Sequence, residues 1–171
     1  GSTATRALTI PLTTAFGYAG KQFMDFETGL RGVKKTTGMT GRELKGFGNE
    51  ISKMSTQIPI SAKNLLGLSE VAGQLGIHGQ KDLLAFTRVM AEMGSATNLA
   101  GEEGAASMAK FANIMGLDVG KNIRSVGDAI VRLGNNYATT ENDIMNMSTR
   151  LAASGRLVGL TTPNVLGLAT A

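Results

Sequence analysis

The side chains that could carry out acid–base, metal-ion or nucleophilic chemistry are few in this sequence. His78 is the single histidine of the chain, and cysteine is absent. Most zinc sites need several histidine or cysteine ligands, and a nucleophilic serine or threonine usually needs a base such as histidine beside it. His78 stands in the glycine-flanked segment Gly76-Ile77-His78-Gly79. We therefore expect it to be a solvated loop residue without a catalytic or metal-binding role.

Two acidic pairs have the spacing of carboxylates that act together as a general acid and a general base. They are Glu102-Glu103 and Glu141 with Asp143. Both pairs fall in predicted first turns of helices, where the helix dipole already explains a negative charge. Gly46-Phe47-Gly48 has no strand before it and no third glycine, so it does not predict a phosphate-binding loop. We predict no catalytic, cofactor-binding or metal site and no enzymatic activity.

The composition favours a folded but pliable protein. Hydrophobic residues make up 42% of the 171 residues and charged residues 18%, which suits one domain with a core or two small helical subdomains. The 23 glycines are about twice the usual share of roughly 7%. Many of them interrupt helical patterns, where each costs about 1 kcal/mol relative to alanine, so we expect locally weak helices.

Charge and hydropathy limit the kinds of partner. The formal net charge of +4 is spread thinly, with Lys34-Lys35 as the one basic doublet, so no specific nucleic-acid binding is predicted. The uncharged runs Ala7–Gly20 and Leu157–Ala171 are shorter than the roughly 20 residues of a membrane-spanning helix. The absence of cysteine fits a reducing compartment. Gly1-Ser2 resembles the remnant of a cleaved tag.

A pair of helices is predicted over residues 1–57. Apolar residues of the first helix form a heptad seam with alternating steps of four and three: Leu12, Phe16, Ala19, Phe23, Phe26, Leu30 and Val33. Pro11 is expected at its start or at a kink. Thr40 and Glu43 have the form of a capping box that begins the second helix. Its seam continues the alternation at Leu44, Phe47, Ile51, Met54 and Ile58. We expect a long antiparallel hairpin zipped along both seams, although the first seam could equally join chains into a homo-oligomer.

Residues 58–171 are predicted to form a globular helical bundle that is truncated at its C-terminus. Pro59 and Ser61 begin a helix that ends at Gly76, and a second apolar stripe follows to Met93. Caps and glycines mark the later boundaries, with starts at Gly101, Asp118, Thr140 and Thr162-Pro163 and ends at Gly116 and Gly134-Asn135-Asn136. No segment alternates with period two. The predicted fold class is an all-α bundle of about seven to eight helices.

Two short motifs recur in the same order. Met54-Ser55-Thr56 returns as Met147-Ser148-Thr149 after 93 residues, and Asn64-Leu65-Leu66-Gly67-Leu68 returns as Asn164-Val165-Leu166-Gly167-Leu168 after 100 residues. The unequal offsets suggest an internal repeat without establishing one, because leucine–glycine strings are common in helical proteins.

Two groups of side chains could form binding surfaces. Six methionines lie mostly on the apolar stripes, where filling of the core is the commoner role: Met90, Met93, Met108, Met115, Met145 and Met147. A basic group on the first helix comprises Lys21, Arg31, Lys34 and Lys35. These cations could bind phosphates or an acidic partner, but a solvated helix face is the more frequent explanation.

Six motifs together carry a resemblance to a known family. They are FxxFE at Phe23–Glu27, TGxTxxEL at Thr37–Leu44, IPxSxxxL at Ile58–Leu65, AGQLGI at Ala72–Ile77, ATNL at Ala96–Leu99 and LGNNYATTENDI at Leu133–Ile144. In this order and spacing, residues 22–171 resemble the core region of tail tape measure proteins of long-tailed bacteriophages or prophages. None of the motifs is catalytic.

The resemblance implies a structural protein that is made in the host cytoplasm and becomes part of the virion tail. Such a protein occupies the tail tube lumen, its length sets the tail length, and it leaves the tube when DNA is delivered. The resemblance also implies oligomers and contacts with tail tube proteins, tail tip proteins and tail assembly chaperones. Two alternatives stay open: a membrane-active helical protein that inserts Ala7–Gly20, and a helical hydrolase, against which the lack of an acid–base pair argues.

Overall fold

All regular structure in the described chain is helical. The computed structural model describes the backbone of residues 3–171 and the side chains of residues 20–171. The helices are α1 (Thr3–Thr37), α2 (Gly41–Gln57), α3 (Ala62–Gln74), α4 (Gln80–Ala96), α5 (Gly101–Met115), α6 (Val119–Asn136), α7 (Glu141–Leu157) and α8 (Thr162–Leu168). Residues 3–171 contain no strand, so the predicted all-α fold and the expected number of helices are confirmed.

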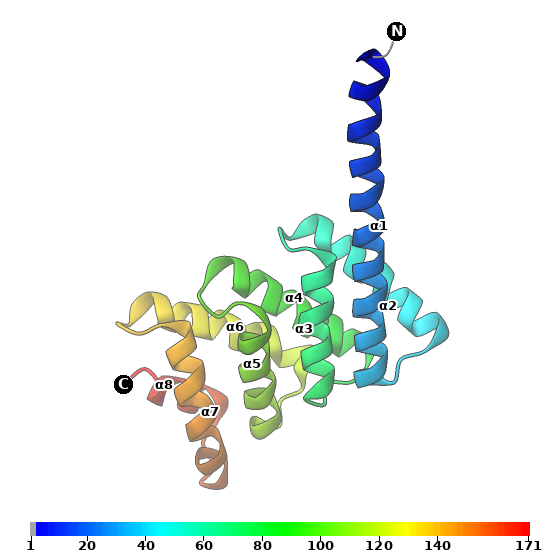
Figure 1. Cartoon of the computed structure of the whole chain (residues 1–171). Coiled ribbons are helices and arrows are strands. Elements are labelled where there is room, and N and C mark those ends of the chain that lie inside the picture. Colours follow the sequence, from blue (N-terminus) through cyan, green and yellow to red (C-terminus); the bar gives the residue numbers. More distant parts are fainter. Residues whose placement is uncertain (1–2) are drawn as a thin grey trace.

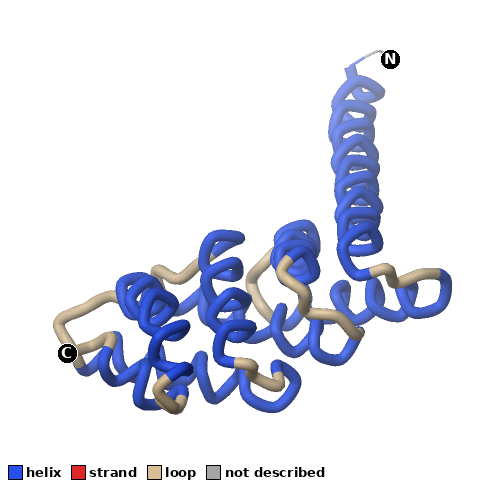
Figure 2. The backbone as a smooth tube through the Cα atoms, turned by 90° about the horizontal axis from the view of Figure 1, so that it is seen from below, coloured by secondary structure: helices blue, strands red, loops and turns tan. Residues whose placement is uncertain are grey.

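The helices form two layers that alternate along the chain. The odd-numbered helices α1, α3, α5 and α7 stand side by side in one layer, and the even-numbered helices lie across them in the second layer (Figures 1 and 2). Within each layer a helix packs against the helix two places further along. The chain is therefore an array of four helix pairs, and its core lies between the layers.

A regular spacing underlies the array. Helices α2, α4 and α6 begin at residues 41, 80 and 119, each 39 residues after the last, and α3, α5 and α7 begin at residues 62, 101 and 141. The turn after every odd helix contains a glycine of positive φ: Gly38, Gly76, Gly116 and Gly159. After Gly76 and Gly116 the next N–H donates to the carbonyl five residues back, as in a Schellman motif. A turn with a positive-φ glycine thus joins the two helices of each pair.

The first layer is built from parallel helices that approach closely. The ion pair between Asp25 and Lys63 (3.4 Å) marks one end of the α1–α3 contact, and Gly73 of α3 lies against Thr36 of α1 at the other. Between them, a Cβ on Gly29 would lie 2.8 Å from the Cβ of Leu66. Glycine in α1 therefore lets the two helix backbones come together.

The expectation that α1 and α2 zip together along their seams is wrong. The main partner of α1 is α3, and α2 crosses α1 where Gly48 approaches Phe26 and Leu30. The seam residues Val33 and Ile51 are buried in the common core, because two stripes of helical period can bury their faces against other helices as well as against each other. Helix α1 lies before residue 57 and α3 lies after it, so their contact joins the two predicted regions 1–57 and 58–171. The division of the chain into two domains at residue 57 stays a prediction.

Most predicted helix ends are confirmed. The side chains of Ser61, Asp118 and Thr140 accept hydrogen bonds from backbone N–H groups in the first turns of α3, α6 and α7, as expected of N-caps. Gly116 has φ of +65° and ends α5. Gly79 has φ of +88° and precedes α4.

Four boundary predictions are corrected. Pro11 lies inside α1 rather than at its start, since the helix begins at Thr3, and the alternative of a kink at Pro11 stays a prediction. Thr40 is the N-cap of α2 but its side chain makes no capping bond. Helix α6 runs through Gly134 to Asn136. The N-cap of α8 is Thr161, one residue earlier than predicted, and its backbone N–H donates to the side-chain oxygen of Asn164 at 3.2 Å.

The recurring motifs do not mark equivalent places in the array. Helix α3 lies in the first layer between α1 and α5, whereas α8 belongs to the second layer and packs on α7 and α6. The spacing of the helix pairs is close to 39 residues, not 93 or 100. The resemblance between the two leucine–glycine strings is therefore local.

Candidate interaction surfaces

The residues with possible catalytic chemistry are separated in the structure. His78 is exposed in the turn that follows α3. Glu102 and Glu103 lie in the first turn of α5, and Glu141 and Asp143 lie in the first turn of α7. Since α3 and α5 are parallel neighbours, the end of α3 and the start of α5 are at opposite edges of the array. Within the described residues, no three His, Cys, Asp or Glu side chains are placed to hold a metal ion.

Among the described residues, shifted pKa values are found for one ion pair at a helix cap. Asp118 Oδ2 lies 2.8 Å from Lys121 Nζ at the start of α6. The hydrogen bond with Lys121 lowers the pKa of Asp118, and the same bond raises the pKa of Lys121. Both side chains are exposed. This pair stabilises the first turn of a helix and forms no cleft that could hold a substrate.

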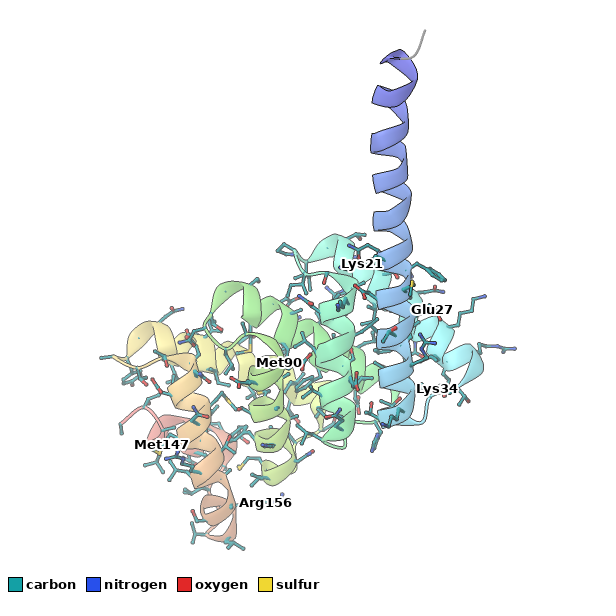
Figure 3. The ribbon with its side chains drawn as sticks, in the orientation of Figure 1. Lys21, Glu27, Lys34, Met90, Met147 and Arg156 are labelled. Atoms are coloured by element: carbon teal, nitrogen blue, oxygen red, sulfur yellow. The ribbon has the colours of Figure 1, made fainter. Side chains whose placement is uncertain are left out.

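The methionine prediction is confirmed in part. Met90, Met93, Met108 and Met145 are buried in the core, where flexible thioethers fill gaps between helices. Met147 is 45% exposed and stands on the outer side of α7 (Figure 3). The helix buries Ile144, Met145 and Ser148, so Met147 does not lie on the buried face of this helix.

The basic group of α1 is divided. Arg31, Lys34 and Lys35 are exposed near the C-terminal end of α1, where positive charge complements the helix dipole. Lys21 lies near the middle of the helix (Figure 3). Arg31 donates a hydrogen bond to the Thr28 hydroxyl at 3.3 Å. The predicted solvated face accounts for these positions, since all four cations are exposed.

Among residues 20–171, the large exposed apolar side chains occur in two regions of the array. Phe23 and Met24 are 66% and 68% exposed on α1, at the base of an N-terminal stretch that extends beyond the other helices (Figure 1). We call residues 3–24 the α1 projection. The other five belong to α7, α8 and the caps of α6 and α7 at the opposite end of the array, and we call them together the C-terminal end surface: Tyr137, Met147, Leu157, Val158 and Leu168.

A groove of about 1040 Å³ lies beside this second surface, between α6 and α8. Its apolar lining includes Leu117, Val126, Leu133, Tyr137, Pro163 and Leu166. Helix α8 has seven residues, whereas α2, α4 and α6 have 17, 17 and 18. Helix α8 therefore covers one part of α6 and leaves the rest of that flank accessible.

Neither the groove nor the end surface was predicted from the sequence. The prediction stopped at an uncharged run over residues 157–171, and four of the five end-surface residues were not singled out. The positive-φ glycines at 38, 76, 116 and 159 are the signal that could have revealed the pairs. With the pairs known, an exposed apolar flank at the end of the array would have been the natural expectation.

Together these features define the chain as an all-α array of helix pairs with two apolar surfaces suited to protein contacts. A family model described as "Phage-related minor tail protein" matches residues 48–171. The chain therefore belongs to the phage-related minor tail proteins.

A longer relative extends the comparison. The chain is 25% identical to a protein described as "Probable tape measure protein" from Halomonas phage phiHAP-1, over 175 aligned residues. The alignment covers 93% of this chain and 20% of the relative, so the chain spans a fifth of that protein's length. No solved structure matches the chain. In the part of the chain that the structure describes, no helix has the length and hydropathy needed to cross a membrane.

Proposed function

We propose that this chain is a structural segment of a phage or prophage tape measure protein, which occupies the tail tube lumen and contributes to tail length. The observation that carries the proposal is the match of 93% of the chain to a relative described as a tape measure protein. Family membership over residues 48–171 supports the same role. In this proposal the chain is made in the host cytoplasm and has no enzymatic step.

The array supports a role that depends on length. Each helix pair contacts its neighbours along the array, so pairs can be added or removed without rebuilding a central core. The partners in this proposal are tail tube proteins, tail tip proteins, assembly chaperones and further copies of the chain through the α1 seam. Phe23 belongs to that seam and is exposed, which leaves it available for such a contact.

Deletion of α4 and α5, which together have the length of one helix pair, in the phage or prophage that encodes the chain tests the role in tail length. Removal of residues 80–118 joins the turn before α4 to the start of α6 and so preserves a native turn-to-helix junction. If the segment is extended as helix in the lumen, 39 residues correspond to about 58 Å at roughly 1.5 Å per residue. Electron micrographs should show tails shortened by up to that length, and duplication of the same residues should lengthen them.

Tails of unchanged length in both variants would refute the contribution to length.

A liposome flotation assay addresses the membrane-active alternative, in which Ala7–Gly20 inserts at a membrane surface. Binding of the wild-type chain to vesicles, abolished by Phe16→Glu, would favour that alternative. We expect the chain to stay in the vesicle-free fraction.

A further inference from the structure

We propose that a cleft between α3, α4 and α5 binds a lysine or arginine side chain of a partner protein, with the carboxylate of Glu102 as the counter-ion. The cleft has a volume of about 350 Å³, and its lining includes Ile60, Leu68, Met90, Gly94 and Glu102. We call it the α3–α5 cleft. This binding site goes beyond the proposed tail role and does not depend on it.

Both walls of the α3–α5 cleft have their neighbours in the array. Helices α3 and α5 pack on each other and on α4, and each has a further helix on its other flank, since α1 packs on α3 and α7 packs on α5. Met90 of α4 belongs to the lining and lies near the middle of the array (Figure 3). The cleft therefore lies inside the array, away from both of its ends.

Small residues leave the α3–α5 cleft open. Gly94 near the end of α4 and Gly101 at the start of α5 contribute backbone but no side chain to the lining. A Cβ on Gly94 would lie 3.4 Å from the Cα of Ala100, so the backbones of the two helix ends are close there. The lining also includes Leu68 and Met90, which are 4% and 1% exposed. The cleft thus offers apolar surface to an aliphatic chain that enters it.

The carboxylate of Glu102 reaches from α5 to α3. A Cβ on Gly67 of α3 would lie 2.8 Å from Glu102 Oε1, so this oxygen lies against the α3 backbone. Among the described residues, no cation forms an ion pair with Glu102 or with Glu103 beside it. Lys63 at the start of α3 pairs with Asp25 of α1 at 3.4 Å instead. The charge of Glu102 is therefore available to a cation from another molecule.

The chain around the α3–α5 cleft has an excess of negative charge. Residues 89–109 contain Glu92, Glu102 and Glu103 but no lysine or arginine. Glu92 is paired with Arg124 at 2.9 Å. The other two carboxylates outweigh the positive end of the α5 dipole, which is equivalent to about half a charge. The last turn of α4 lines the cleft and has no basic residue, although the carbonyl end of a helix favours a cation.

A cationic side chain matches these features better than other ligands. Lysine and arginine combine an apolar stem with a charged head, so the stem can cover Leu68 and Met90 while the head pairs with Glu102. An anionic ligand would be repelled by the carboxylates, and a purely apolar side chain would leave Glu102 without a counter-ion. Ligand pockets usually have roughly 300–1,000 Å³, and a cleft of about 350 Å³ suits one side chain rather than a helix.

Titration with two matched peptides tests the site. The probe is an acetylated and amidated five-residue alanine peptide with arginine at its centre. The reference peptide carries citrulline instead, which has nearly the same shape as arginine but no charge. The NMR signals of the methyl groups of Ile60, Leu68 and Met90 report binding at the cleft. Peptide concentrations extend to about 10 mM, which covers weak dissociation constants, and the ionic strength is held constant.

Three variants of the chain provide the controls. Glu102→Gln removes the proposed counter-ion. Glu103→Gln removes the same charge from the same helical turn, at a residue outside the lining of the cleft. Gly94→Leu adds a side chain to the lining. Circular dichroism and thermal unfolding show whether each variant is folded, and if Gly94→Leu does not fold, the two charge variants decide.

We expect the wild type to bind the arginine peptide about 5-fold more tightly than the citrulline peptide, which is the size of effect that a well-formed exposed ion pair produces. Glu102→Gln should abolish this preference, Glu103→Gln should change it less than about 2-fold because its charge is screened by solvent, and Gly94→Leu should weaken the binding of both peptides.

Four results would overturn the site. Methyl signals that do not move show that nothing binds in the cleft, and a folded Gly94→Leu variant with unchanged affinity places the peptide elsewhere. Equal binding of the two peptides by the wild type, or an unchanged preference in Glu102→Gln, excludes Glu102 as the counter-ion. A loss of preference in Glu103→Gln as large as in Glu102→Gln shows a diffuse acidic surface in place of a specific pair. The tail-length experiment tests the tail role separately from all of these.

Discussion

The substitution Ile130→Ala tests the packing of α6 most directly. Ile130 is 0% exposed in the core between the layers. The change removes three carbon atoms, worth about 2.4 kcal/mol at roughly 0.8 kcal/mol for each buried methylene-sized group. The cavity left behind adds a further penalty, which places the expected loss at about 3–4 kcal/mol, inside the range of about 2–5 kcal/mol for such substitutions.

The free energy of unfolding is measured by urea denaturation followed by circular dichroism, with thermal unfolding as a second readout. A loss of about 3 kcal/mol corresponds to a decrease in Tm of roughly 6–12 °C for a chain of this size. Leu157→Ala is the matched control, because Leu157 is 89% exposed and surface changes usually stay within about 0.5 kcal/mol. Equal stability of the two variants would refute the helix register on which the core assignment depends.

Two further predictions concern backbone contact and charge. Gly29→Ala should destabilise the chain by about 1–3 kcal/mol relative to Gly20→Ala, because a Cβ at position 29 meets Leu66 at 2.8 Å whereas a Cβ at position 20 has nothing within 4 Å. Urea denaturation of both variants measures the difference in the free energy of unfolding. Equal values would contradict the close α1–α3 contact. Asp118→Asn should remove a pH-dependent contribution: the pKa of Asp118 is lowered from 3.8 by Lys121, so its charge stabilises the folded chain above that value and the benefit is lost as the pH falls through the folded pKa. Urea titrations at decreasing pH should show the wild type losing stability faster than the variant, and parallel curves would exclude this role.

The local structure was predictable because its causes are local. Ser61 and Asp118 cap helices through hydrogen bonds to residues three positions later, and such caps are visible in the sequence. Gly116 ends α5 because its φ of +65° favours glycine. The seam residue Val33 is buried, as its helical spacing indicates. Each of these predictions needed only a few neighbouring residues.

The pairing of helices was not predictable from the same patterns. The apolar stripes on α1 and α2 indicate that each helix buries one face, but they do not identify the helix that covers that face. The choice of α3 as the partner of α1 depends on small residues, since Gly29 and Gly73 let the backbones approach. In the sequence these glycines are indistinguishable from those in exposed positions such as Gly20. The groove between α6 and α8 escaped prediction for the same reason, because it depends on which flank of α6 lacks a neighbour.

The close approach at glycines links the composition to the architecture. A glycine inside a helix costs about 1 kcal/mol in helix propensity, so in a sequence with 23 glycines some glycines must stabilise the fold in other ways. Positive-φ glycines stabilise the turns, where other residues would be strained. Gly127 stabilises the packing of α6 on α4, because a Cβ there would lie 2.9 Å from a methyl group of Val89. The helices are thus weak as isolated segments and depend on their neighbours in the array. Such dependence on neighbours predicts that the loss of one helix weakens the helices that pack on it.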